Sequence, residues 1–583
     1  MFKRIIKRKF LKKYWSSISA PATMMLGFSV LVGASVGLAY VIFRWLISFF
    51  IKFFFTDIQG YLSYVFGHFS IILIPVAGAI LFSPLIYYFS RESKGHGIPD
   101  VIIAMETKGG RIRPIVGFIK SISSAICIGS GGSAGAEGPV VQIGASIGSA
   151  LGQLFHMSEE RVKNLVACGA AGGIAAAFNA PIGGLFYALE VVFRDFSARR
   201  ISNVVLASVS ASVVADIFLG NERLVTLPSY AIHSPVELLF YIILGIIIIP
   251  FSIIFIRGFY GMEDYFDRLK VHALYKPVIG ALLLGFIGFF FPQVFGIGYE
   301  NIRGALNSTI PFSLMLILIP LKLLAVFLTL GSGGSGGLFT PSLVLGALVG
   351  GAFGSVLAVL FPHMVIEPGA YALVGMAAFF AGSSRAPMTA FLILFELTGD
   401  YFMILPLMLA VAITTIGAEW FQKESIDTLK VVRLGINLNK EMIRDILESI
   451  RVKEILGKET SSVKPSATID EIVTAVEKEN RGTITVVDDN GEFRGIIPLS
   501  EIITILKNKD ALMYVVVAED LVKDVPCLDE SESLQEALRK FVESGSDVLP
   551  VIRVVDSYKK LSGIILKHDI LSAYRREMSV RKG

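Results

Sequence analysis

Hydrophobic residues dominate the chain from about Leu26 to Phe421, where only short polar or glycine-rich segments separate the apolar runs. Some runs reach the roughly 20 residues that a membrane-spanning helix needs, whereas others are about half that length. Short apolar helices suit segments that enter a membrane and end where the surrounding protein shields their ends. After about residue 450, polar and apolar positions alternate as they do in soluble proteins. The pattern therefore predicts a polytopic helical membrane part followed by a soluble part.

Two sequence patterns occur once in each half of the membrane part. The segment 129–133, Gly-Ser-Gly-Gly-Ser, returns at 331–335, and a proline follows each copy at the same offset, at Pro139 and Pro341. A second pattern, Ala-Pro followed nine residues later by glutamate, ends at Glu190 and again at Glu396. Glycine-interrupted hydrophobic segments at matching places in two halves indicate a transporter built from repeats, with its site where broken helices meet.

The glycine- and serine-rich segments have the chemistry of anion sites. Each leaves backbone N–H groups unshielded, and each leads to a proline that can occupy the first turn of a helix. A helix start carries free N–H donors and a positive partial charge equivalent to about half a charge. Two such starts aimed at one point would bind an anion without lysine or arginine. Neither segment contains a cation, which favours transit of the anion because tight binding would prevent its release.

The composition supports a membrane protein and argues against several other classes. Of 583 residues, 54% are hydrophobic and 17% are charged, and the mean hydropathy is +0.67; about 25% charged residues is usual in soluble proteins. A net charge of +5 gives no reason to expect nucleic-acid binding. Three scattered cysteines and seven dispersed histidines form no disulfide framework and no metal-ligand spacing, so we expect no structural metal.

The changes in composition divide the chain into parts. Basic residues and aromatics crowd the N-terminus, which the positive-inside rule places in the cytoplasm. An amphipathic helix on the inner leaflet is expected there, and a disordered basic tail is the alternative. The apolar segment from Met24 to Phe55 is too long for the core of a signal peptide. The expected parts are a basic N-terminal helix 1–20, a membrane domain 21–421 with halves of about 21–220 and 230–421, a linker 422–450, and two soluble modules, 451–508 and 516–578.

The soluble part contains its own repeat of helix, strand, strand and helix. The expected first unit has a helix at 468–479, strands at 483–487 and 494–498, and a helix at 500–506. The second has a helix at 533–544, strands at 547–552 and 561–565, and a helix at 567–574. This arrangement resembles a tandem pair of CBS modules, which are small α/β units found beside membrane domains.

Three segments of the membrane part together resemble a known family. They are Gly-His-Gly-Ile-Pro at 95–99, Gly-Ala-Glu-Gly-Pro at 135–139 and Gly-Leu-Phe-Thr-Pro at 337–341, and 178–181 and 396–400 extend the match. In this order they are similar to the signature segments of the CLC family of anion channels and proton-coupled anion exchangers. The resemblance implies an all-α membrane domain with an inverted repeat and broken helices, followed by the α/β CBS pair.

The resemblance also implies roles for individual residues. Glu137 matches the family's gating glutamate, whose carboxylate can occupy an anion site and block it; a glutamate that only caps a helix is the alternative. Leu338 and Phe339 match positions whose backbone amides line the central anion site. The remaining positions assigned to the anion path are His96, Gly97, Ile98, Pro99, Ala136, Gly138 and Asp427.

Four positions differ from the family pattern. His96 stands where a serine often holds chloride, and Ala136 replaces a basic residue. Asp427 stands where a tyrosine commonly closes the inner side of the site. Because a carboxylate would repel chloride, we expect Asp427 to face the cytosol or to pair with Lys423 or Lys430. Val191 occupies the place where proton-coupled members generally carry a glutamate; valine cannot relay a proton, which favours passive conduction.

Other acidic residues have two interpretations each. Glu190 and Glu396 are intramembrane carboxylates and therefore functional candidates by default. Their matching places in the two halves instead favour structural bonds to helix termini. In the tail, Asp569 fits the residue with which CBS pairs contact a nucleotide ribose, but Pro498 and Leu566 replace the usual hydroxyl residues. An adenine nucleotide and a purely structural or dimerising tail are both open interpretations.

Two other classes of function were weighed against anion transport. The segment 131–135 satisfies G-x-S-x-G, and 333–336 resembles the serine loop of intramembrane rhomboid proteases. The hydrolase motif, however, requires a strand before the serine and a base within reach, whereas these loops follow apolar helical sequence. A cation transporter would need carboxylates or unwound carbonyls in place of helix starts.

The sequence thus predicts a membrane protein that is not an enzyme and requires no cofactor. Its expected activity is selective anion transport, with chloride as the ion and passive conduction gated by Glu137; proton-coupled chloride exchange is the alternative. The family implies a homodimer in the plasma membrane, with the N-terminus and the CBS tail in the cytoplasm.

Overall fold

The computed structural model divides the chain into two compact units, residues 1–436 and 437–583. It describes all residues except 1–21, 197, 221–229, 231–233, 400, 437–446, 457–460, 479–482, 499–500, 502, 504–515, 556–557 and 583. The basic N-terminal helix expected at 1–20 and most of the helix expected at 500–506 fall outside the described residues.

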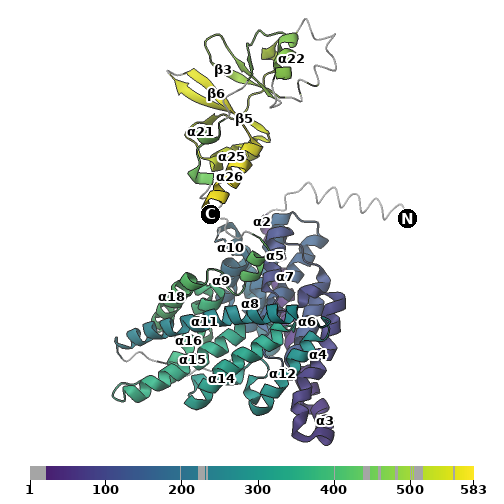
Figure 1. The fold of residues 1–583 in the computed structure, drawn as a ribbon, viewed down its shortest axis with the longest axis vertical. Helices are drawn as coiled ribbons and strands as arrows, with labels where there is room; N and C mark the ends of the chain where they lie inside the picture. The colour runs from purple at the N-terminus through teal and green to yellow at the C-terminus, as the bar shows by residue number, and fades with distance from the viewer. Residues whose placement is uncertain are drawn as a thin grey trace, which may run out of the picture. The chain divides into compact units, whose positions relative to one another are not determined.

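The first unit consists of helices, several of which are short or interrupted (Figure 1). In its first half the α-helices are α2 (Ala22–Lys52), α3 (Gln59–Phe66), α4 (Ser70–Phe89), α5 (Ile98–Thr107), α6 (Pro114–Gly129), α7 (Glu137–Leu154), α8 (Glu159–Phe178), α9 (Pro181–Tyr187) and α10 (Ala198–Leu219). In its second half they are α11 (Glu237–Arg268), α12 (Lys276–Phe290), α13 (Tyr299–Leu306), α14 (Phe312–Val326), α15 (Phe339–Leu360), α16 (Pro368–Ser384), α17 (Pro387–Thr398), α18 (Ile404–Phe421) and α19 (Leu429–Arg433).

Short π and 3-10 segments lie between these helices. The π-helical segments are η1 (Phe53–Ile58), η4 (Ala188–Phe193) and η6 (Phe327–Gly331), and the 3-10 turns of this unit are η2 (Gly67–Phe69), η3 (Arg91–Ser93) and η5 (Pro292–Val294). η6 directly precedes the second Gly-Ser-Gly-Gly-Ser segment, and η4 carries Glu190 and Val191. Helical backbone thus changes its pitch beside the segments that the sequence singles out.

Matching glycines let the helices of each half pack backbone against backbone. A Cβ at Gly144 on α7 would lie 2.1 Å from the Gly169 carbonyl oxygen on α8. At the matching position of the second half, a Cβ at Gly346 on α15 would lie 2.2 Å from the Gly375 carbonyl oxygen on α16. Small residues are the usual means of close helix packing in membranes. The two helix pairs α7–α8 and α15–α16 are therefore built in the same way.

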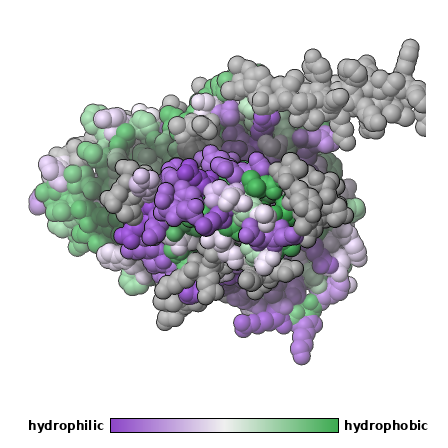
Figure 2. Space-filling view, turned by 90° about the horizontal axis from the view of Figure 1, so that it is seen from above, coloured by the Kyte–Doolittle hydropathy of each residue, from purple (hydrophilic) through white to green (hydrophobic). Residues whose placement is uncertain are grey.

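The surface of the first unit is apolar where its long helices are exposed. Within the described residues, six helical stretches are long and apolar enough to cross a membrane by length and composition. Exposed large side chains include Leu239 and Ile246 on α11 and Leu283 and Phe286 on α12. In Figure 2, hydrophobic residues spread over the left flank of the visible face. Apolar surface of this extent fits contact with lipid.

The second unit contains two three-stranded sheets of the same topology. The strands are β1 (Ser462–Val463), β2 (Thr483–Val487), β3 (Phe493–Pro498), β4 (Leu528–Asp529), β5 (Val548–Val555) and β6 (Tyr558–Leu566). The first sheet has the order β1-β2-β3 and the second β4-β5-β6, each with one parallel and one antiparallel pair. In the antiparallel pairs Val486 lies opposite Gly495 and Val551 opposite Gly563, and the register shifts directly after each valine.

The helices of the second unit complete two mixed α/β modules. They are α21 (Val452–Ile455), α22 (Ile469–Lys478), η7 (Ala518–Leu521), α25 (Leu534–Ser544) and α26 (Lys567–Lys582). Each core includes a segment that precedes the other module: Val452 packs with Leu549 and Ile565, and Ala518 packs with Ile484 and Ile497. The expected fold class, an all-helical membrane part followed by a small α/β pair, is therefore confirmed.

Candidate functional site

Three glycine-rich loops of the membrane unit meet through backbone hydrogen bonds. The Gly135 and Gly337 amides each donate to the other residue's carbonyl, at 2.8 and 2.7 Å, in an antiparallel bridge. The Gly95 amide donates to the Gly334 carbonyl at 2.9 Å, and the Gly336 amide donates to the Gly95 carbonyl at 3.3 Å. These loops lead into α5, α7 and α15. The expectation that the two serine-bearing turns lie together is thus confirmed, and the start of α5 joins them.

The loops approach so closely that Gly138 leaves no room for a side chain. A Cβ at this position would lie 2.7 Å from the His96 carbonyl oxygen and 2.8 Å from the Gly337 Cα. Both neighbours are backbone atoms of the other loops, which cannot rotate away as a side chain would. Gly97 precedes α5 with a φ of 81°, a left-handed conformation that favours glycine. Glycine therefore sets the spacing of the three helix starts.

The N-terminal residues of these helices are those expected from the sequence. Ile98 and Pro99 form the first turn of α5, and Ala136 directly precedes α7, which begins at Glu137. Leu338 directly precedes α15, which begins at Phe339. Free backbone donors and the positive ends of three helix dipoles therefore lie within one small region.

Glu137 is buried and bonded at this junction. The residue is only 1% exposed, and the Tyr299 hydroxyl donates a hydrogen bond to Oε1 of its carboxylate at 2.9 Å. Tyr299 is the first residue of α13 and follows Gly298, which has a φ of 92°. Sequence analysis missed Tyr299. A signal was present: Gly296-Ile-Gly298-Tyr299 has the same glycine spacing as Gly95-His-Gly97-Ile98, 201 positions earlier.

Two buried lysines, which were not predicted from the sequence, donate hydrogen bonds to the loops that precede α5 and α13. The Lys120 ammonium donates to the carbonyls of Ser93 and Gly95 at 3.1 and 2.7 Å. The Lys322 ammonium donates to the carbonyls of Val294 and Gly296 at 3.0 and 3.1 Å. Each lysine lies nine residues before a Gly-Ser-Gly-Gly-Ser segment. The two Gly-Ser-Gly-Gly-Ser segments carry no cation, but one buried lysine donates to the residues that precede α5 and one to those that precede α13.

Phe339 is packed among aromatic rings at the start of α15. Its ring centroid lies 4.1 Å from that of Phe380 and 4.9 Å from that of Phe178. The Tyr187 ring follows at 6.4 Å, and its buried hydroxyl has no hydrogen-bond partner in the described structure. The aromatic contacts thus lead from the start of α15 to an unpaired hydroxyl group.

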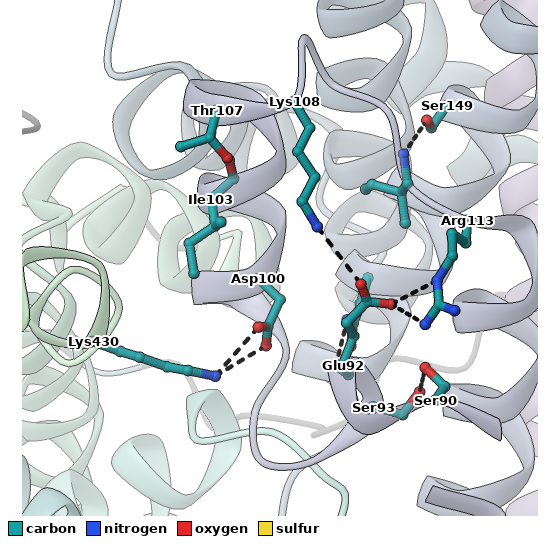
Figure 3. A network of polar contacts seen from close by, with 12 residues as sticks. Ser90, Glu92, Ser93, Asp100, Ile103, Thr107, Lys108, Arg113, Ser149 and Lys430 are labelled. Atoms are coloured by element: carbon teal, nitrogen blue, oxygen red, sulfur yellow. Dashed lines mark hydrogen bonds and ion pairs between the residues drawn. The ribbon is translucent and has the colours of Figure 1, made fainter. Parts of the chain in front are cut away.

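The expectation for Asp427 is wrong. The residue is 2% exposed, and its Oδ1 lies 3.6 Å from Nδ1 of His96, which is itself 3% exposed. Lys430 instead pairs with Asp100 at 3.3 Å, as Figure 3 shows. The repulsion expected between a carboxylate and chloride does not turn Asp427 outward, because α19 packs against α5 and an imidazole lies beside the carboxylate.

Glu190 and Glu396 bond to helix starts across the two halves, as expected. Glu190 accepts hydrogen bonds from the Met388 amide at 2.9 Å and the Thr389 amide at 2.7 Å, at the start of α17. Glu396 accepts from the Ile182 and Gly183 amides at 2.9 and 2.6 Å, at the start of α9. Each carboxylate therefore caps a helix of the other half, an arrangement that helix dipoles favour.

Val191 and Asp569 are the two remaining candidates from the sequence. Val191 is buried in η4 beside Glu190. Asp569 in the second unit accepts a hydrogen bond from the Leu566 amide at 2.9 Å, at the start of α26. The carboxylate proposed for a ribose therefore also caps a helix.

Comparison with known proteins identifies the family. A protein-family model described as voltage gated chloride channel matches residues 77–419, more than half of the chain. The chain belongs to the CLC family. A second model, the CBS domain, matches this CLC protein twice, at 452–508 and 517–576. The resemblance drawn from the signature segments and from the tail repeat is confirmed.

Individual relatives include proteins named for both transport modes. Chloride channel protein CLC-f of Arabidopsis thaliana is 31% identical over 500 residues, which cover 75% of this CLC chain and 63% of CLC-f. The H⁺/Cl⁻ exchange transporter ClcA of Vibrio vulnificus is 34% identical over 358 residues, which cover 60% of this chain and 75% of ClcA. This chain thus spans less than two thirds of the length of CLC-f.

A solved structure, that of a slow cyanobacterial Cl⁻/H⁺ antiporter, has the same fold. It superimposes with a TM-score of 0.66 at 27% identity and covers 73% of this CLC chain and 100% of its own. The inverted-repeat helical fold inferred from the sequence is confirmed. Anion transport is the activity of the family, and intramembrane hydrolysis has no support: the Ser335 hydroxyl donates to the Ser93 carbonyl at 2.9 Å.

Proposed function

We propose that this protein conducts chloride passively through a pathway that the Glu137 carboxylate opens and closes. The observation that carries the proposal is the place of Glu137, which is the first residue of α7 and lies buried where the starts of α5, α7 and α15 converge. An ionised carboxylate there resembles an anion held by helix N-termini. It therefore occupies the region in which a passing chloride would bind.

The gate opens when the Glu137 carboxylate loses its charge or leaves its position. Protonation from solution converts the carboxylate into a neutral acid, which the positive helix ends no longer attract. The Tyr299 hydroxyl bond to Oε1 opposes this change because it stabilises the charged form. Chloride then replaces the carboxylate at the helix starts. Binding by partial charges, without a lysine in the loops, leaves the ion weakly held and able to leave.

Passive conduction is favoured over exchange by the residue at position 191. Coupled exchange needs a proton carrier along a second route, and Val191 has no group that can hold a proton. The second candidate is proton-coupled chloride exchange by a different proton route. It is favoured by the names of two relatives, the Vibrio vulnificus exchange transporter and the cyanobacterial antiporter.

A reversal-potential measurement separates the two candidates. The purified protein is reconstituted into planar bilayers with equal chloride and a tenfold proton gradient. We expect a reversal potential of zero for passive conduction, whereas a shift that follows the proton gradient would establish exchange. In the same bilayers Glu137→Gln is expected to remove the dependence of flux on pH at the Glu137 side. Unchanged pH dependence in Glu137→Gln and Glu137→Ala would overturn the assignment of the gate.

The cellular setting and the tail follow from the same proposal. We place the protein in the plasma membrane as a homodimer, with one pathway in each subunit and the N-terminus and CBS pair in the cytoplasm. The CBS pair is the candidate site for an adenine nucleotide, with Asp569 toward the ribose. Calorimetry of the full-length protein with ATP, ADP and AMP tests that assignment, and the absence of heat with all three would leave the pair a structural role.

A further inference from the structure

A second buried carboxylate, that of Asp427, lies beside the loop that leads into α5. His96 lies directly before Gly97 and α5, and Asp427 lies two residues before α19. The two side chains are 4% and 3% exposed, and His96 Nδ1 is 3.6 Å from Asp427 Oδ1. Among the described residues, both ring nitrogens and the other carboxylate oxygen, Oδ2, have no hydrogen-bond partner. Buried polar atoms without partners are uncommon and require an explanation.

The structure holds the two residues in this arrangement from both sides. Lys430 on α19 pairs with Asp100 in the first turn of α5, at 3.3 Å, and this ion pair joins the two helices (Figure 3). The Tyr260 hydroxyl on α11 donates to the Ile426 carbonyl at 2.6 Å, next to Asp427. Since the segment is fixed at both ends, Asp427 is directed at His96 by the fold and does not lie there by chance.

The groups around the pair are mostly neutral. The Phe259 ring meets the imidazole edge-on with centroids 5.7 Å apart, and the Ser384 hydroxyl faces the carboxylate. The Tyr187 and Tyr260 hydroxyls are close enough to Asp427 to interact with it electrostatically, and Tyr260 interacts with Glu263 in the same way.

Two lysines act on the histidine from a greater distance. They are Lys430, which Asp100 pairs, and Lys120, which donates to the Ser93 and Gly95 carbonyls. Neither forms an ion pair with Asp427 among the described residues, and the basic side chain beside the Asp427 carboxylate is the His96 imidazole, with Nδ1 at 3.6 Å from Oδ1. His96 is therefore the group that decides the net charge beside this carboxylate.

The charge of the pair sets whether an anion can enter the region beside it. With Asp427 ionised and His96 neutral, the pair carries one negative charge and repels chloride. One proton, on either residue, makes the pair neutral, and the start of α5 can then attract the anion. Asp427 would thus exclude chloride in the same way as Glu137, whose ionised carboxylate competes with an anion for the helix N-termini. The ring nitrogen of His96 that carries no hydrogen and the Asp427 Oδ2 atom, which have no hydrogen-bond partner among the described residues, are the sites at which the proton can bind.

We propose that His96 and Asp427 together bind a proton at the α19 end of the anion pathway, and that chloride passes this end only while the pair holds that proton. The inference rests on the proposed anion pathway but not on its passive mode. Exchange by a route without Val191 would use the same proton site. The proton comes from the solution on the α19 side and returns to it, or continues along the pathway in an exchanger.

The test measures chloride flux while pH is changed only on the α19 side. The full-length protein is reconstituted into planar bilayers, and its orientation is assigned by access of a protease to the C-terminal tail. Glu137→Gln serves as the background because it removes the titrating carboxylate at the start of α7. In that background we expect flux to fall by about tenfold for each unit of rising pH, the limiting slope for one bound proton, once the pair titrates.

Asp427→Asn is the decisive variant, since asparagine keeps the shape and removes the charge. We expect it to abolish the response to pH on the α19 side, and His96→Ser to shift the response to a different pH range. The matched control is Asp264→Asn, which removes an exposed carboxylate paired with Arg433 on α19 and should keep the response. In the Glu137-containing protein, an intact response of Asp427→Asn to pH on the Glu137 side shows that the variant is folded.

A persistent response in Asp427→Asn would overturn the proton site while leaving the Glu137 gate intact. The converse result is equally distinguishable. Loss of the α19-side response in Asp427→Asn, together with an unchanged Glu137-side response in Glu137→Gln, would support the His96–Asp427 proton site and overturn the proposed gate.

Discussion

The two halves of the membrane unit share a backbone framework and differ in the side chains that this framework presents. Both halves have a glycine-rich loop before a helix start, a buried lysine that donates to two carbonyls, and a glutamate that caps a helix of the other half. Yet α7 begins with Glu137 where α15 begins with Phe339.

The same contrast holds for the second pair of helices. α5 follows a loop that carries His96, and its first residue is Ile98, whereas α13 begins with Tyr299. The ionisable group is in the loop of one half, and the hydroxyl group is on the helix of the other. The comparison shows that the repeated segments give both halves the same helix N-termini. Ionisable side chains that occur in only one half make the chemistry of the two halves different.

The largest expected effect comes from the shared spacing of the loops. Gly138→Ala would bring a Cβ within 2.8 Å of backbone in two other loops, so at least one helix start must move. Overpacking of a tight core costs about 1–3 kcal/mol, and more where backbone must shift. We expect loss of chloride flux in liposomes and a lower midpoint of thermal unfolding in detergent.

Gly261→Ala on α11 is the matched control, because nothing lies within 4 Å of the added Cβ. Alanine there should leave flux unchanged and stabilise the helix slightly. Normal flux in Gly138→Ala would mean that the loops are separated more widely than the structure has them.

A smaller effect tests whether the two halves are equivalent in their helix caps. Glu190→Gln and Glu396→Gln each remove a charged acceptor of two backbone amides. Hydrogen bonds to charged groups contribute about 1.5–3 kcal/mol, and glutamine retains one neutral acceptor, so we expect each variant to lose about 2 kcal/mol of stability. Glu190→Gln should lose slightly more, because the Thr389 hydroxyl also donates to Glu190.

The measurement is the midpoint of thermal unfolding, compared with that of Glu92→Gln. Glu92 pairs with Arg113 at a partly exposed site (Figure 3). Such surface pairs contribute at most about 1 kcal/mol. If only one of the two capping variants is destabilised, the caps are not equivalent, and the two halves do not share this feature of the framework.

Features that depend on local or repeated sequence patterns could be predicted, whereas contacts between residues far apart in the chain could not. Repeated segments predicted the meeting of the helix starts, and alternation predicted β2, β3, β5 and β6 close to their observed bounds. The two-residue strands β1 and β4 are too short for alternation to register. π-Helical segments leave no pattern distinct from that of an ordinary helix.

The side chains at the site were harder to predict because their partners are distant in the chain. The resemblance assigned Asp427 to the anion path, but the argument from its repulsion of chloride predicted that the side chain faces outward. The partner that keeps it inward, His96, comes from a loop more than 300 residues earlier. Lys120 and Lys322 were overlooked because a lysine in an apolar helix does not reveal which carbonyls it will meet. The glycine spacing before Tyr299 repeats the spacing around His96, but spacing alone does not show which side chain the Tyr299 hydroxyl will contact.

The smallest expected effect concerns the side chain that only the second half supplies. Tyr299→Phe removes the hydroxyl that donates to Glu137 Oε1 at 2.9 Å and keeps the ring. One hydrogen bond to a charged group contributes about 1.5 kcal/mol at the lower end of its range, which corresponds to roughly tenfold in the gate equilibrium. We expect chloride flux at high pH on the Glu137 side to rise by up to that factor, because the closed position of the carboxylate is less stabilised.

Tyr230→Phe provides the control from the opposite end of the same helix. The Tyr230 hydroxyl donates to the Leu306 carbonyl at the end of α13, at 2.9 Å, so its loss tests α13 without touching Glu137. Comparable flux in the two variants would assign the Tyr299 hydroxyl to the packing of α13. A change confined to Tyr299→Phe, and absent when Glu137 is also replaced by glutamine, would show that the second half restrains the gate of the first.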